Sequence, residues 1–225
     1  MTLPARRSRR LRPDRHGRHF DLRRTLRSSL RTHGETFRRA TRGPRTGRRG
    51  LVLVLDVSGS MGPYSRALMQ FGHAAMGAGR RVDVFCFGTR LTNVTRPLRA
   101  TDPDTALARA SRAVEDWEGG TRIGESLKEL LDGYTSSASV RGAVVVVCSD
   151  GLERGDPELL GAQMARLGRL AHRIVWVNPL KGSPLYSPLA RGMSAALPHI
   201  DEFVSGHNIA SLEALADAVA TRAVP

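Results

Sequence analysis

From residue 50 onward, short apolar runs alternate with amphipathic stretches. The predicted strands span residues 51–55, 82–87, 91–94, 143–148, 174–177 and 202–204. Several of these runs are apolar at every position, which indicates strands buried on both faces, as in a parallel sheet covered by helices. Helical spacing of apolar residues predicts helices at 64–78, 104–114, 124–131, 157–170 and 209–220. The pattern therefore predicts a three-layer, doubly wound α/β fold with a mostly parallel sheet.

Two local signals refine this pattern. Asp156 is a good N-cap and is followed by proline, which suits the first position of the helix predicted at 157–170. Leu22, Leu26 and Leu30 recur at helical spacing among arginines, so a short helix that docks on another surface is predicted within residues 19–39. Residues 43–49 are rich in Arg and Gly and are predicted to be a linker.

Charge divides the 225-residue chain unevenly. The first 50 residues hold 17 Arg against Asp14, Asp21 and Glu35, a surplus of +14 that equals the formal net charge of the whole chain. The remainder balances 18 basic with 18 acidic residues. Like-charge blocks stay extended while folded domains mix both signs, so we expect a basic, Arg-rich arm at 1–49 and a domain at 50–225.

Two interpretations of the arm remain open. It would bind an acidic partner, such as nucleic acid, anionic lipid or an acidic protein surface. Alternatively, because lysine occurs only at Lys128 and Lys181, the arginines reflect a GC-rich coding sequence. We prefer the compositional interpretation, since basic runs are weak signals on their own.

Apolar content also bears on the compartment. No secretory apolar region follows the early arginines, and the longest apolar runs are far shorter than the roughly 20 residues that span a bilayer. Cys86 and Cys148 sit in apolar, strand-like runs, where a thiol behaves as a small buried hydrophobe. A cytoplasmic protein in a reducing compartment is expected.

The sharpest chemical feature is Asp56-Val-Ser58-Gly-Ser60, directly after the apolar run 51–55. In open α/β sheets, ligands bind beyond the carboxyl ends of the strands. Thr121, in a glycine-rich turn that opens a predicted helix, and Asp150, in Ser-Asp-Gly after the run 143–148, reach the same edge. Carboxylate and hydroxyl oxygens suit Mg²⁺, or another hard divalent cation such as Mn²⁺.

The charge of this set indicates a use for the metal. Two carboxylates only just neutralise a dication, and hydroxyls add electron donors without adding charge. The metal would remain electrophilic, and a water-filled position on it would accept an acidic side chain from a partner protein.

These motifs resemble a known site. Asp-x-Ser-x-Ser after an apolar strand, Thr in a later Gly-rich loop, and Ser-Asp-Gly after another strand resemble the metal-ion-dependent adhesion site (MIDAS) of von Willebrand factor A (VWA) domains. Further segments resemble the CoxE-like VWA proteins, namely Ser65-Arg-Ala-Leu, Phe87-Gly-Thr-Arg-Leu-Thr, Asp116-Trp-Glu-Gly-Gly-Thr-Arg-Ile-Gly124, Arg154-Gly-Asp-Pro-Glu-Leu-Leu160, His172-Arg-Ile-Val-Trp-Val-Asn-Pro-Leu-Lys-Gly182 and Leu197-Pro-His. The similarity extends from about Asp21 to the end of the chain.

The resemblance implies a non-enzymatic role. CoxE-like proteins are encoded beside MoxR-type AAA+ ATPases. They are thought to help these ATPases in the maturation of client enzymes such as carbon monoxide dehydrogenase, or in the insertion of metal centres into them. The implied cofactor is Mg²⁺. The family's metal ligands fall on Asp56, Ser58, Ser60, Thr121 and Asp150, with none substituted.

Several alternative functions fit part of these motifs. The Asp56 motif would occur by chance in a capped strand-to-helix turn without metal, although its strand and companion loops argue against this. A phosphatase-like hydrolase would use Asp56 as a nucleophile, but its family expects Asp where Ser58 stands. The glycines at 119 and 124 resemble a phosphate-binding loop, except that Glu125 replaces the essential lysine.

The remaining alternatives rest on the arm and on scattered residues. A nucleic-acid binder would use the basic arm alone and would lose affinity steeply with salt. The seven His residues show no zinc spacing. Trp117 and Trp176 are interpreted as packing residues, with Trp117 a second candidate for lining a partner groove beside the metal loop.

Overall fold

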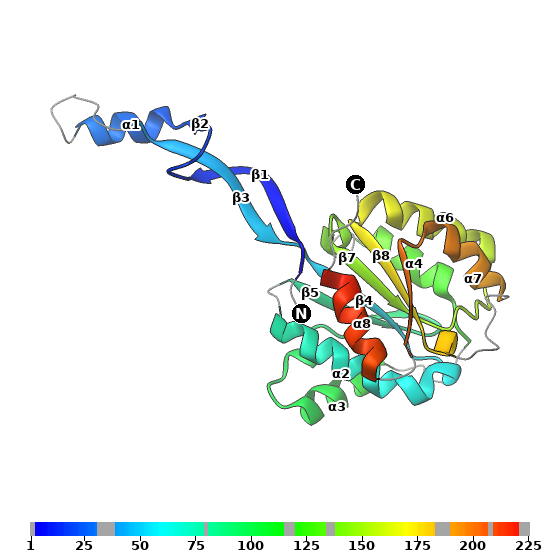
Figure 1. Cartoon of the computed structure of the whole chain (residues 1–225). Coiled ribbons are helices and arrows are strands. Elements are labelled where there is room, and N and C mark those ends of the chain that lie inside the picture. The colour runs from blue at the N-terminus through cyan, green and yellow to red at the C-terminus, as the bar shows by residue number, and fades with distance from the viewer. Residues whose placement is uncertain are drawn as a thin grey trace. The chain divides into compact units, whose positions relative to one another are not determined.

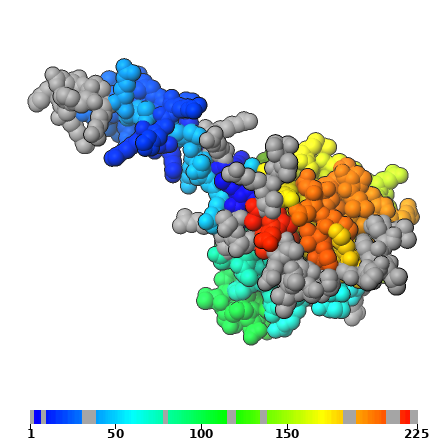
Figure 2. All heavy atoms as spheres, viewed as in Figure 1, coloured from blue at the N-terminus to red at the C-terminus, as the bar shows by residue number. Residues whose placement is uncertain are grey.

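The computed structural model describes most of the chain. The described residues are 3–30, 39–78, 81–114, 120–133, 138–182, 190–206 and 209–220, drawn in colour in Figure 1. Figure 2 shows the heavy atoms of the chain as spheres in the same view. The chain divides into two compact units: an arginine-rich unit, Ala5–Arg48, and a larger unit, Met1–Pro4 with Arg49–Pro225.

The larger unit is built on a six-stranded sheet with the order β6-β5-β4-β7-β8-β9. Its strands are β4 (Leu51–Asp56), β5 (Val82–Phe87), β6 (Leu91–Asn93), β7 (Val144–Cys148), β8 (Arg173–Asn178) and β9 (Glu202–Ser205). All pairs are parallel except β5 with the edge strand β6. The mostly parallel sheet predicted from the apolar runs is confirmed.

Helices cover both faces of this sheet (Figure 1). One face carries α2 (Gly62–Ala78), α3 (Pro103–Ala113) and α8 (Ile209–Ala220), and the other carries α4 (Ile123–Asp132), α6 (Pro157–Leu170) and α7 (Arg191–Ala196). Along β4, Leu51, Leu53 and Leu55 pack on the first face while Val52 and Val54 pack on the second. The three-layer architecture follows, because a strand that buries both sets of side chains needs a helical layer on each side.

Short 3₁₀ turns join several elements: η2 (Gly59–Met61), η3 (Pro97–Arg99), η4 (Pro179–Gly182) and η5 (Leu197–His199). The bounds predicted for α6 and α8 match the structure, and those of α2, α3 and α4 differ by one or two residues. The six-residue helix α7 was not predicted, because it is too short to show a periodic pattern.

The arginine-rich unit contains more regular structure than an extended arm. Its strands β1 (Ala5–Pro13), β2 (His19–Phe20) and β3 (Thr41–Arg48) form an antiparallel sheet with the order β1-β3-β2. The prediction of a linker at 43–49 is therefore wrong, since most of these residues belong to β3. Backbone pairing holds these strands, and backbone pairing needs no apolar alternation that a sequence pattern would reveal.

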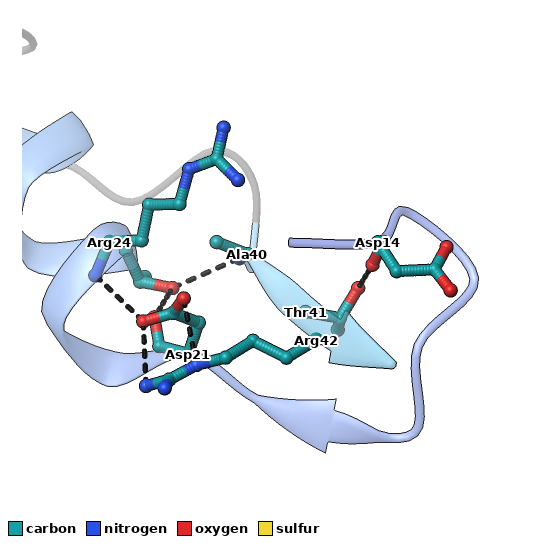
Figure 3. Close-up of polar contacts among 7 residues, drawn as sticks. Asp14, Asp21, Arg24, Ala40, Thr41 and Arg42 are labelled. Atoms are coloured by element: carbon teal, nitrogen blue, oxygen red, sulfur yellow. Dashed lines mark hydrogen bonds and ion pairs between the residues drawn. The ribbon is translucent and has the colours of Figure 1, made fainter. Parts of the chain in front are cut away.

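Helix α1 (Leu22–Ser29) confirms a short helix within the predicted range, whose residues 31–38 lie outside the described part of the chain. Polar contacts attach it to the unit (Figure 3). Asp21 caps it by accepting from the Arg24 amide at 3.1 Å, and its carboxylate pairs with Arg42 Nε at 2.8 Å. Thr25 Oγ1 accepts from the Ala40 amide at 3.0 Å. The face of α1 that packs on the unit is thus the polar one.

Both cysteines lie inside the sheet. Cys86 and Cys148 are free thiols with no exposed surface. Burial raises the pKa of Cys86 to about 12 and raises that of Cys148 further still. They behave as the small buried hydrophobes expected from the sequence. No helix in the described part of the chain has the length and apolarity needed to cross a bilayer.

Candidate metal site

Asp56 is the last residue of β4 and is fully buried. One carboxylate oxygen, Oδ1, accepts the Ser58 amide at 2.9 Å, and the other, Oδ2, accepts the Ser149 hydroxyl at 2.6 Å. The next residue, Val57, donates its amide to the carbonyl of Phe87 on β5 at 2.9 Å. The chain is therefore held in the sheet up to the point where it turns into the loop, which fixes the direction of the carboxylate.

The two serines follow in the loop that leads into α2. Their hydroxyl oxygens lie 3.3 Å apart, close enough to share a hydrogen bond. Ser58 is buried whereas Ser60 is exposed, so the pair runs from the Asp56 carboxylate out to solvent. The Met61 amide donates to the Ser58 carbonyl at 2.9 Å and closes the η2 turn that sets this arrangement.

Asp150 follows β7, the strand that pairs with β4. It is buried, and its Oδ1 accepts the Leu152 amide at 3.0 Å. Its backbone carbonyl accepts the side-chain amide of Asn178 at 3.0 Å. Its negative charge acts on Asp56, which places the two carboxylates in one electrostatic environment.

Thr121 reaches this edge through its backbone. It is buried, and its carbonyl accepts the Arg154 amide at 2.9 Å, which ties its loop to the loop after β7. The neighbouring Arg122 amide donates to the Gly88 carbonyl at 3.0 Å, which ties the same loop to the end of β5. The structure thus brings three separated loops together at the carboxyl ends of β4, β5 and β7.

The electrostatics of Asp56 are unusual for an aspartate. Burial raises its pKa from 3.8 to about 6, hydrogen bonds from Ser149 and Ser58 lower it, and the charge of Asp150 raises it again. Two buried negative groups repel each other, and a cation between or beside them would relieve that repulsion. The donor set therefore fits a hard divalent cation.

In the described part of the chain, no three side chains of the His, Cys, Asp and Glu types gather closely enough to hold a metal ion, so a cation at this edge would need the hydroxyls as well as the two carboxylates.

The loop that resembles a phosphate-binding loop is unsuited to phosphate, because the Gly124 amide donates to the Glu153 carboxylate at 2.8 Å. An acid occupies the direction from which a phosphate would come.

Sequence reasoning missed three supporting residues. Ser149 binds Asp56 directly and also accepts the Gly151 amide at 3.0 Å, while the Trp176 indole donates to the Ser149 carbonyl at 2.9 Å. Asn178 holds the Asp150 backbone. Ser149 stood within the Ser-Asp-Gly triplet, but nothing in the sequence showed which strand it would face. Trp176 is buried, as expected of a packing residue, and Trp117 and Gly119 lie outside the described residues.

Solved structures similar to this chain support the fold. A von Willebrand factor type A protein from Catenulispora acidiphila matches with a TM-score of 0.55 and 16% identity over 80% of this chain and 44% of its own. Proximal thread matrix protein 1 of the mussel byssus matches with a TM-score of 0.53 and 14% identity over 76% of this chain and 47% of its own. A second structure of the mussel protein, with a zinc-occupied MIDAS motif, matches with a TM-score of 0.51 and 14% identity over 76% of this chain and 46% of its own. The chain spans less than half the length of each.

No curated protein is significantly similar to the chain in sequence. The family model described as "VWA domain containing CoxE-like protein" matches residues 1–212. That match begins before Asp21, where the resemblance noted in the sequence began, and so includes the arginine-rich unit. With a VWA-type sheet and this family match over most of its length, the chain belongs to the VWA domain-containing CoxE-like proteins.

Proposed function

We propose that the chain binds a divalent cation, Mg²⁺ or Mn²⁺, through Asp56, Ser58, Ser60, Thr121 and Asp150, and uses it to bind a partner protein without catalysing a reaction. The observation that carries the proposal is the buried Asp56 carboxylate, whose pKa is raised to about 6 at an edge where a second carboxylate and two hydroxyls converge. Such a group is poorly solvated alone and well suited to a cation.

The chain's own residues would prepare the site before any metal arrives. Ser149 and the Ser58 amide fix the orientation of Asp56, and Asn178 fixes the backbone of Asp150. Groups of this kind hold metal ligands in place and tune them. A dication bound there would be neutralised by the two carboxylates without a surplus of negative charge. It would therefore still attract an acidic side chain from a partner.

The exposed residue Ser60 marks the side from which a partner would approach. Membership of the CoxE-like family supports a MoxR-type AAA+ ATPase as that partner, with a client metalloenzyme such as carbon monoxide dehydrogenase, in the cytoplasm. In the mussel protein a MIDAS motif holds zinc, a divalent cation of the charge that this donor set would accept.

Thr121→Val tests the metal site with little risk to the fold. The substitution removes the hydroxyl, keeps the shape, and leaves the backbone bond from Arg154 in place. We expect affinity for Mg²⁺ and Mn²⁺, measured by isothermal titration calorimetry, to fall by about tenfold or more. The matched control is Thr105→Val, at an exposed position on α3, which should bind as the wild type does. Equal affinity in both variants would remove Thr121 from the ligand set.

Asp56→Ala tests partner binding. We expect it to abolish capture of the MoxR-type ATPase in a pull-down with Mg²⁺, to the level that the wild type shows in EDTA. Capture by the wild type that EDTA does not change would contradict a metal-dependent interface, even if the metal itself binds.

A further inference from the structure

Helix α1 presents leucines to solvent. Leu22, Leu26 and Leu30 are 56%, 54% and 80% exposed, and Phe20, just before the helix, is 52% exposed. Among the described residues, the exposed large hydrophobic side chains are Leu11, Phe20, Leu22, Leu26, Leu30, Leu152 and Leu180. Most of them therefore lie within the small arginine-rich unit, where an apolar surface is concentrated on one element.

The outward direction of the leucines follows from how α1 is attached. Thr25 and Ser29 are its buried residues, and Thr25 is bonded to the Ala40 amide. At about 100° per residue, Leu22, Leu26 and Leu30 form one stripe about 80° wide beside that polar face. An amphipathic helix normally buries its apolar stripe, whereas this one leaves the stripe available for a partner.

Cationic side chains lie next to the stripe. Arg23 and Arg27 follow it around the helix, and with Arg24, Arg42 and Asp21 they line a hollow of about 340 Å³. Asp21 already forms an ion pair with Arg42 and caps the N-terminus of α1, so its negative charge is compensated within the unit. Arg23, Arg24 and Arg27 are exposed residues. Residues 5–48 carry 16 Arg against three acids, a formal charge of +13.

We propose that α1 docks the arginine-rich unit on a membrane surface rich in anionic phospholipid. The leucine stripe would enter the boundary between head groups and acyl chains, and Arg23 and Arg27 would bind lipid phosphates at its border. A short apolar stripe alone binds a bilayer weakly, and stable attachment needs a second, electrostatic signal. This helix carries both signals side by side, and it lies outside the proposed metal site.

Two other polyanionic partners explain less of the surface. The phosphates of a nucleic acid would engage the arginines but would gain nothing from three exposed leucines. An acidic protein groove that held the leucine stripe would pair its charges only with the arginines bordering that stripe. Exposed arginines instead extend over the whole unit, from Arg12 on β1 to Arg45 on β3, which suits the spread charge of a membrane surface.

Sedimentation of the full-length chain with lipid vesicles tests the proposal. We expect binding to vesicles of phosphatidylcholine with roughly 30–40% phosphatidylglycerol, a proportion that gives a strongly negative surface, and little binding to phosphatidylcholine alone. Leu26→Gln/Leu30→Gln should reduce partitioning by about tenfold or more. Arg23→Gln/Arg27→Gln should reduce it by about fivefold per arginine. All four positions are exposed, so these variants should keep the fold, which circular dichroism would verify.

Matched controls use the larger unit. Leu180→Gln and Arg109→Gln change an exposed leucine and an exposed arginine elsewhere and should leave partitioning unchanged. EDTA should have no effect, which separates this surface from the metal site. The proposal is overturned if the chain ignores anionic vesicles. It is also overturned if the leucine variant binds anionic vesicles as the wild type does. A third contrary result would be a wild-type chain that binds duplex DNA or an acidic protein instead of vesicles, with that binding weakened in the leucine variant.

Discussion

Replacing Asp56 by asparagine should stabilise the metal-free fold at neutral pH. Folding raises the pKa of this carboxyl from 3.8 to about 6, so the folded state prefers the protonated, neutral form. The advantage of the folded state is complete below pH 4 and is lost as pH rises through about 6. An increase of this size in the pKa corresponds to about 3 kcal/mol at neutral pH. Asparagine has the neutral form at every pH and should recover most of that energy.

Thermal unfolding in EDTA measures this effect. About 3 kcal/mol corresponds to roughly 6–12 °C in Tm for a domain of this size, so the asparagine variant should melt higher than the wild type at pH 8 and equally at pH 4. Added Mg²⁺ should raise the Tm of the wild type by mass action and leave the variant unchanged. A variant that melts lower than the wild type at pH 8 in EDTA would refute the reasoning, because the buried charge would then not be costly.

Three further changes test the support of the site. Ser149→Ala removes the hydroxyl that donates to Asp56 and should cost about 1–3 kcal/mol in urea unfolding; a loss below measurement would show that the bond is dispensable. Gly151 has φ +81, and an added Cβ would lie 3.0 Å from the Met193 side chain, so Gly151→Ala should cost about 1–3 kcal/mol by the same assay. Asp156→Ala removes the N-cap of α6 and should cost about 1 kcal/mol without changing affinity for Mg²⁺.

Much of the larger unit was predictable because its signals are local. The run Leu51–Leu55 is apolar throughout, and burial on both sheet faces is its direct consequence. The start of α6 followed from Asp156 and Pro157, whose capping geometry the structure contains. The acidic and hydroxyl residues of the candidate site could be singled out because each follows a strand or lies just before a helix, and their role as metal ligands stays a prediction.

The arginine-rich unit could not be predicted in the same way. Strands β1 and β3 pair through their backbones, and most of their described side chains are exposed, so the two sequences carry no alternation of apolar and polar residues. The role of Ser149 also depends on a neighbour: its hydroxyl reaches Asp56 only because β7 pairs with β4 in this register. Contacts between residues far apart in sequence leave no trace in the composition of either segment.

The central place of β4 has a consequence for synthesis of the chain. This strand pairs with β5 on one side and with β7 on the other, and 87 residues separate Asp56 from Val144. While those residues emerge from the ribosome, one edge of a strand that is apolar from Leu51 to Leu55 has no partner. An unpaired strand edge of this kind recruits other chains into aggregates. The nascent protein is therefore most vulnerable before β7 is complete, and a chaperone that covers this edge would improve its yield.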